Sequence, residues 1–226
     1  MQQSDLFNGT EATQRLTHRV QAWELAEDQQ LLAAAIEPFA TGGKAGTVSR
    51  KLIARFGSYR AVLTADPADL MAVRGMTFDA ANAIKIAQAS ALRLLKHEAK
   101  AGTILSSWTA LLDYLKAAMG SEPREQLRVL FMDTRNRLIA DEKMWEGTPN
   151  HTQCYPSEIV RKALLQHATA IIITHNHPSG DPQPSRADIV MTQEIKAAAE
   201  ALRIFLHDHI IIAQDRHLSF RQEGLL

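Results

Sequence analysis

The sequence predicts a small all-helical domain over residues 19–100, followed by an α/β (α+β) domain over residues 104–226. Two observations predict this division. In the first part, apolar residues recur at the spacing of helices. In the second part, short runs with strand character alternate with helical segments, which is the pattern of a sheet flanked by helices. Residues 1–18 are polar and show neither period, so we expect a flexible N-terminal arm there.

Composition and charge narrow the class of protein. The chain has 226 residues, 46% of them hydrophobic, and a formal net charge of zero, so it can build a core, and its charge indicates neither nucleic acid nor membrane. No apolar run approaches the roughly 18 residues that span a bilayer, and Met1 to Asp5 are not expected to begin a secretory signal. Because Cys154 is the single cysteine, an internal disulfide is excluded and a cytoplasmic location is expected.

Helices are expected at about residues 20–36, 48–56, 78–100 and 108–119. Asp66 before Pro67 marks a further helix start, since an N-cap is followed by proline in the first turn. Gly102 is a plausible domain boundary, and Ser107 can cap the helix that follows it.

Residues 52–86 resemble a helix–hairpin–helix unit, which holds DNA phosphates on the backbone N–H groups of a helix N-terminus. The resemblance lies in Asp66-Pro67, Leu70 and the turn around Gly75, and it implies that DNA could bind through residues 44–78. That stretch includes a basic run with no acid among its members: Lys44, Arg50, Lys51, Arg55 and Arg60. However, Thr77 occupies the place of the second glycine of such hairpins, so a helical docking domain is the interpretation that we favour.

The second part alternates strands and helices. Strands are expected at residues 127–133, 138–145, 170–174, 206–213 and 218–220, the first two forming a hairpin. Helices are expected at about 155–167 and from Ser185 to about Leu202, where apolar residues recur at helical spacing.

The segment from His175 to Asp188 contains a candidate metal site. His175 and His177 are two residues apart after a strand, so both imidazoles can point to one side. Prolines and a glycine at positions 178, 180, 182 and 184 force a stiff loop that returns Asp188 towards them. Two neutral imidazoles and one carboxylate are a usual set for zinc with a position left for water. The alternative is a turn whose histidines are only hydrogen-bonded.

The order His-x-His, seven residues, Ser, two residues, Asp resembles the JAMM motif of the MPN+/JAB metalloprotease superfamily, and the whole string from His175 to Asp188 resembles its bacterial RadC branch. The resemblance covers residues 104–226 and implies the JAB/MPN fold, a curved mixed sheet with helices on both sides and a cytidine-deaminase-like core. It also implies a hydrolase with one zinc ion per chain on His175, His177 and Asp188, acting on a peptide or isopeptide bond.

In this family a glutamate on the strand hairpin before the metal loop acts as general base, and Glu142 is the candidate here. The alternative is that Glu142 is only an exposed strand residue. Asp141 points to the opposite face, so both acids cannot serve, while Glu146 and Glu158 are weaker candidates. Ser185 begins a capping-box spacing, but the resemblance implies that it donates to the oxyanion. One hydroxyl could do both.

Other residues have simpler interpretations. His207-Asp208-His209 repeats the His-x-His spacing in a core strand, where a structural or supporting role is favoured over a second metal. His151 follows a loop that the family places near the cleft, Cys154 has no activating base in the sequence, and Asp181 is expected to close a turn.

Three functions fit these features. The first is the zinc hydrolase. The second is a DNA-associated repair or recombination accessory protein, in which the JAB domain binds a partner or acts on nucleic acid; salt-dependent DNA binding would favour it. The third is a zinc-bound structural protein without turnover. A substitution of Glu142 should spare the zinc content in either case, but it can abolish activity only in an enzyme.

Overall fold

The computed structural model describes residues 4–40, 44–100, 102, 108–147 and 155–226. The chain forms two compact units, residues 1–89 and 90–226. Their division lies inside the long helix α6 (Phe78–Lys100) and not at Gly102, where the sequence placed it. The reason is packing, because Leu95 and Ala99 of α6 belong to the same core as Leu111 of the second unit. None of the described helices combines the length and apolar character needed to cross a membrane.

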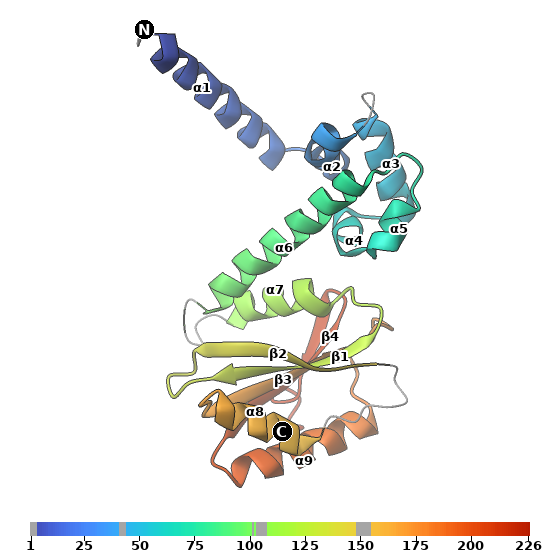
Figure 1. The fold of residues 1–226 in the computed structure, drawn as a ribbon. Helices are drawn as coiled ribbons and strands as arrows, with labels where there is room; N and C mark the ends of the chain where they lie inside the picture. Colours follow the sequence, from blue (N-terminus) through green and yellow to red (C-terminus); the bar gives the residue numbers. More distant parts are fainter. Residues whose placement is uncertain (1–3, 41–43, 101, 103–107, 148–154) are drawn as a thin grey trace. The chain divides into compact units, whose positions relative to one another are not determined.

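The first unit is all-helical. It consists of α1 (Ser4–Glu24), α2 (Asp28–Ile36), a 3-10 helix η1 (Glu37–Phe39), α3 (Ala45–Phe56), α4 (Tyr59–Thr64), α5 (Pro67–Met71) and the first part of α6 (Figure 1). Leu32, Leu52 and Ile84 are buried in one core. Asp66 caps α5 by accepting a hydrogen bond from the backbone of Ala68, as its place before a proline predicts.

The N-terminal segment differs from the arm without regular structure that we expected over residues 1–18. Residues 4–24 form α1, with Arg15 and Glu11 paired across one turn. The physical reason is that a polar sequence lacks a face for packing but not helix propensity, and this segment has one glycine and no proline. Side chains 11–22 are exposed, so the described part of α1 buries little surface.

The hairpin between α5 and α6 turns at Gly75, whose φ of +101° favours glycine. Thr77, at the place of the expected second glycine, caps α6 with its hydroxyl. Nearby basic side chains already have partners: Lys51 donates to a backbone carbonyl of the hairpin, and Arg55 pairs with Asp69. These contacts favour a docking role over phosphate binding.

The second unit is built on a mixed sheet, which confirms the predicted fold class. Its described strands, in the order β2-β1-β3-β4-β5, are β1 (Glu125–Met132), β2 (Leu138–Gly147), β3 (Ala170–Asn176), β4 (Phe205–Ala213) and β5 (Arg216–Ser219). β3 and β4 are parallel, and every other neighbouring pair is antiparallel. Helix α7 (Trp108–Met119) covers one face, and α8 (Pro156–Leu165) and α9 (Arg186–Glu200) cover the other (Figure 1).

Alternation along the strands separates two cores. Leu130 and Ile172 pack with α7, whereas Val129 and Ile173 pack with residues of α8 and α9. His175 is two residues beyond Ile173 and therefore lies on the same face of the sheet. The loop that follows β3 thus begins on the side of α9, which returns the chain to β4.

Asp141 points to the face of α7, as its alternation with Glu142 predicts. Its buried carboxylate accepts hydrogen bonds from Nε of Arg128 at 3.0 Å, from Nη2 at 2.9 Å and from the hydroxyl of Tyr114, and Nζ of Lys96 lies 3.6 Å away. Burial alone would raise the pKa of Asp141, but the hydrogen bonds and charge of Arg128 and the other partners outweigh it and lower the pKa.

We expect Asp141→Asn to lower the free energy of unfolding by about 3–5 kcal/mol, because the substitution leaves Arg128 buried without its charged partner. Urea denaturation at pH 7 measures the loss, with the exposed Glu146→Gln as control. Since the folded pKa of Asp141 is lowered, its contribution is present above the unfolded pKa of about 3.9 and is lost as pH falls through the folded value. The difference from wild type should therefore shrink below about pH 4. A loss no larger than that of the control would contradict this account.

Candidate metal centre

The structure brings together the three predicted ligands. His175 lies near the end of β3, His177 follows that strand, and Asp188 lies in the first turn of α9. Nε2 of His175 is 2.9 Å from Nε2 of His177 and 3.4 Å from Oδ1 of Asp188, and Nε2 of His177 is 3.8 Å from Oδ2 of Asp188. In the described ranges, these three side chains form the one group of His, Cys, Asp or Glu able to hold a metal ion.

The spacing of the two imidazole nitrogens and the Asp188 carboxylate fits a tetrahedral zinc site. Bonds of about 2.0–2.1 Å at tetrahedral angles place neighbouring ligand atoms about 3.3 Å apart, and the separations found here lie on both sides of that value. Nδ1 of His177 is 2.7 Å from the carbonyl oxygen of Asp181. A carbonyl can only accept, so Nδ1 has the proton and Nε2 presents a lone pair to the site.

The burial of His175 favours its neutral imidazole. Burial lowers the pKa of His175 to about 4, against the opposing effect of the Asp188 charge. At neutral pH His175 therefore has no positive charge, which is the state that binds a metal ion.

Strands β4 and β5 support the loop after β3, which contains His177 and Gly180. The backbone N–H of His177 donates to the carbonyl of Ile212 at 2.8 Å, and Arg216 donates to the carbonyl of Gly180. Gly180 has a φ of +80°, and a Cβ there would lie 3.1 Å from the side chain of Gln214. A side chain at position 180 would therefore be strained and would crowd the hairpin between β4 and β5.

Ser185 forms the capping box that its spacing predicts. Its Oγ accepts a hydrogen bond from the backbone N–H of Asp188 at 3.1 Å, while its own backbone N–H donates to Oδ2 of Asp188 at 2.7 Å. The Ser185 hydroxyl also lies 2.7 Å from Oδ2, to which it donates. Ser185 thus orients the ligand carboxylate, and donation to an oxyanion, which would require that proton to turn away, stays a prediction.

Asn176, between the two histidines, fixes the neighbouring strand. Its Oδ1 accepts from the backbone N–H of Gln126 at 2.9 Å, and its Nδ2 donates to the carbonyls of Glu122 and Arg124 at 3.2 and 3.1 Å. All three contacts lie around the start of β1, where Glu125 is found. Asn176 therefore ties the backbone around Glu125 to the backbone of the candidate metal ligands.

Glu142, the predicted general base, is engaged by α8 and the residue that follows it. It accepts hydrogen bonds from Nζ of Lys162 and, at 2.7 Å, from Nε2 of Gln166. The bond from Lys162 is the main cause of its lowered pKa. Among the described residues, no hydrogen bond or ion pair joins Glu142 to the three ligands, so its catalytic role stays a prediction.

Glu125, which the sequence analysis did not single out, lies within electrostatic reach of the site. Burial raises the pKa of Glu125, His177 opposes that shift, and the negative charge of Asp188 adds to it. The antiparallel register explains the proximity, because Leu127, two residues along β1, is paired with His175. Glu125 begins the first strand of the hairpin that the resemblance indicated, whereas Glu142, the residue predicted from the sequence, lies on the second strand.

The second His-x-His segment does not form a metal site with its own histidines. Nε2 of His207 bonds to Oδ1 of Asn136 at 2.7 Å, whereas Nε2 of His209 lies 2.8 Å from Nδ1 of His175. Asp208, between them, is buried and accepts from the hydroxyl of Ser219 and from two backbone N–H groups. His209 thus lies against the candidate ligand His175, and its supporting role stays a prediction.

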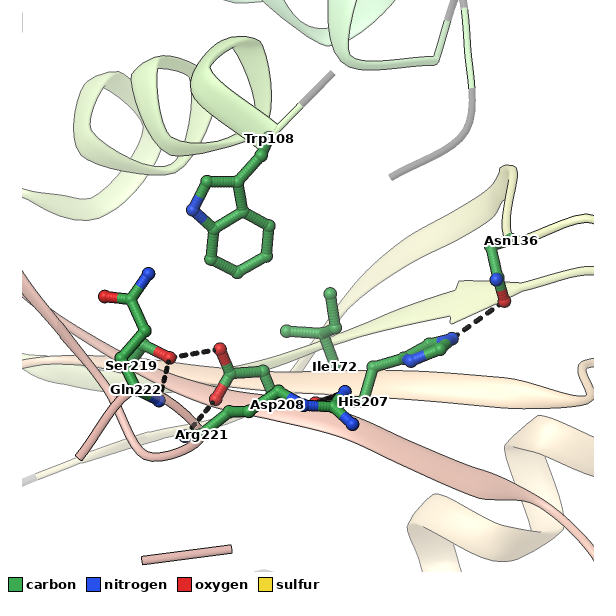
Figure 2. Close-up of a pocket in the computed structure, with 8 residues that line it drawn as sticks. All are labelled: Trp108, Asn136, Ile172, His207, Asp208, Ser219, Arg221 and Gln222. Atoms are coloured by element: carbon green, nitrogen blue, oxygen red, sulfur yellow. Dashed lines mark hydrogen bonds between the residues drawn. The ribbon is translucent and has the colours of Figure 1, made fainter. Parts of the chain in front are cut away.

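A separate cavity of about 370 Å³ lies next to Asp208 (Figure 2). Its lining consists of Trp108, Asn136, Ile172, His207, Asp208, Ser219, Arg221 and Gln222. Figure 2 shows the indole of Trp108 facing the strand residues, and the Asp208 carboxylate held by Ser219 and the backbone of Arg221. The hydrogen bonds of Asp208 are made within the protein, which fits a structural role, and burial raises its pKa against their effect.

Of the remaining candidates from the sequence, Asp181 lies among the described residues. Asp181 closes a turn, since its Oδ1 accepts from the backbone N–H of Gln183 at 3.2 Å. Ser107, His151 and Cys154 lie outside the described residues.

A mixed sheet with two histidines at the end of one strand and an aspartate in the next helix is the arrangement of a JAB-type domain. A sequence model of the RadC-like JAB domain matches residues 105–225. A UPF0758 protein of Rhodobacter capsulatus is 51% identical over 179 residues, which are 79% of this chain and 84% of that protein. A UPF0758 protein of Ruegeria pomeroyi is 45% identical over 179 residues, 79% of this chain and 80% of its own length. The chain therefore belongs to the RadC-like JAB domain family.

Proposed function

We propose that the protein is a zinc-dependent hydrolase that cleaves a peptide or isopeptide bond. The main support is the convergence of two imidazole nitrogens and one carboxylate, with separations that suit a tetrahedral ion. Zinc held there by three protein ligands would supply a Lewis acid and lower the pKa of a water molecule to about 7. The bond that is cleaved, and zinc as the metal, come from the resemblance and belong to the proposal.

The residues of the chain divide the remaining work. His175 and His177 bind as neutral ligands, and Asp188 adds one negative charge. A carboxylate must remove a proton from the attacking water and pass it to the leaving nitrogen. Glu142 is the sequence-based candidate, but Glu125 is the better one, because it begins the strand that pairs with the end of β3 and interacts electrostatically with His177 and Asp188. Its partly buried position also favours proton uptake, because burial raises its pKa.

Removal and return of the metal test this proposal. The full chain, stripped with a chelator, should not cleave a panel of fluorogenic peptides and isopeptide-linked substrates, and one equivalent of zinc should restore cleavage. Cleavage that is unaffected by the chelator would contradict a metal-dependent reaction. Zinc binding without cleavage of any member of the panel would favour the structural zinc protein.

DNA binding through residues 44–78 stays a prediction, as does a role in repair or recombination. The first unit gives it little support, because Lys51 and Arg55 already have protein partners and Thr77 caps α6. A protein or peptide substrate is the partner that the metal site supports better.

A further inference from the structure

A buried chain of hydrogen bonds runs behind the candidate metal centre and joins two of its ligands. Nδ1 of His175 is 2.8 Å from Nε2 of His209, and Nδ1 of His209 is 2.6 Å from Oγ1 of Thr192. The Thr192 hydroxyl lies 2.6 Å from the backbone carbonyl oxygen of Asp188, one turn earlier in α9. His175, His209 and Thr192 are all buried.

The proton positions in this chain follow from its last member. The Asp188 carbonyl can only accept, so the single hydroxyl proton of Thr192 is donated to it. The oxygen of Thr192 must then accept from Nδ1–H of His209. His209 is fully buried, and no carboxylate among the described residues forms an ion pair with it, so this imidazole is neutral and its Nε2 has a lone pair.

The same sequence of donors fixes the tautomer of His175. Because Nε2 of His209 can only accept, Nδ1 of His175 has the proton and Nε2 presents its lone pair to the site. In the opposite arrangement every proton in the chain reverses. Nε2–H of His175 would then point towards Nε2 of His177, 2.9 Å away, and would block metal binding.

The hydrogen-bond partner of Nδ1 of His175 does not by itself fix which nitrogen of His175 has the proton, so another group has to fix it. A metal-binding histidine usually donates its second N–H to a carboxylate, a carbonyl or water. His175 instead faces another imidazole, which can serve as donor or acceptor. We propose that Thr192 and His209 are positioning residues that select the metal-binding tautomer of His175, with the Asp188 carbonyl setting the direction of the chain. This inference rests on the metal site of the proposed function but not on hydrolysis.

Two matched substitutions at one position test the inference. Thr192→Val keeps the shape of the side chain and removes the hydroxyl, so His209 can adopt either tautomer; zinc affinity should fall about tenfold or more. Thr192→Ser restores the hydroxyl and should bind zinc close to wild type. Thr174→Val is the control, because Thr174 is equally buried and adjacent to His175, but its hydroxyl contacts only Sδ of Met119 at 3.6 Å among the recorded hydrogen bonds of the described residues. Competition with a chromophoric zinc chelator measures all four proteins.

A second measurement needs no substitution. In ¹⁵N spectra of the metal-free wild-type protein, the ring nitrogens of His175 and His209 should both show the Nδ1–H tautomer. An Nε2–H tautomer of His175, or zinc affinity in Thr192→Val equal to that of wild type, would overturn the inference. If Thr192→Val does not fold, the wild-type spectrum decides the question. If the wild type binds no zinc, the proposed function fails, and the spectrum still reports separately on the direction of the chain.

Discussion

Purified protein with His177→Ala or Asp188→Ala is expected to contain almost no zinc, whereas the wild type should contain about one ion per chain. Each substitution leaves two of the three side chains whose ligand atoms converge. Two protein ligands are too few for a stable zinc site, so the expected loss is nearly complete. Elemental analysis after gel filtration measures the metal content directly.

His207→Ala provides the matched control for these variants. His207 has the same residue type, but its Nε2 bonds to Asn136 and it is not part of the convergent group. His207→Ala should keep its zinc. That result would show that the loss of zinc in His177→Ala is not a general effect of removing a histidine. Circular dichroism should show a folded protein in each case. A wild type without metal, even after zinc is supplied, would end the hydrolase proposal.

Glu125→Gln is expected to keep its zinc and to reduce kcat/KM for a cleaved substrate by about 10²–10⁴-fold, the usual contribution of a general base. The amide has nearly the shape of the carboxylate but cannot take a proton. Glu142→Gln should keep its zinc and most of its activity, because it loses only a hydrogen-bonded ion pair with Lys162. Steady-state kinetics on both variants, prepared in parallel, compares the two candidate bases.

The reverse result would be equally informative. If Glu142→Gln abolishes activity and Glu125→Gln does not, the sequence-based candidate is the base, and the ion pair with Lys162 must open during turnover. If neither substitution reduces activity in a zinc-containing protein, neither Glu125 nor Glu142 acts as the base and the proposed mechanism is wrong.

Local sequence patterns were a good guide to the helices and strands and to the three candidate metal ligands. Alternation predicted that Asp141 and Glu142 face opposite sides of β2, and the stiff loop brought Asp188 to the two histidines. The same local signals could not find Glu125. Its proximity depends on the register between β1 and β3, which pairs Leu127 with His175, and no short-range pattern encodes that pairing.

Two further differences have similar causes. Helix α1 forms although its polar residues have no apolar period, because propensity does not depend on a partner surface. The division between the compact units lies within α6, because Leu95 and Ala99 pack with Leu111, a contact between helices that the chain order alone does not reveal.

The three hydrogen bonds of Asn176 have a consequence for how the centre meets a substrate. They connect backbone to backbone through one amide, so the strand that begins at Glu125 cannot move away from the end of β3 without breaking them. In the proposed hydrolase, the distance between Glu125 and the candidate metal ligands would therefore be set when the sheet forms, before any substrate arrives.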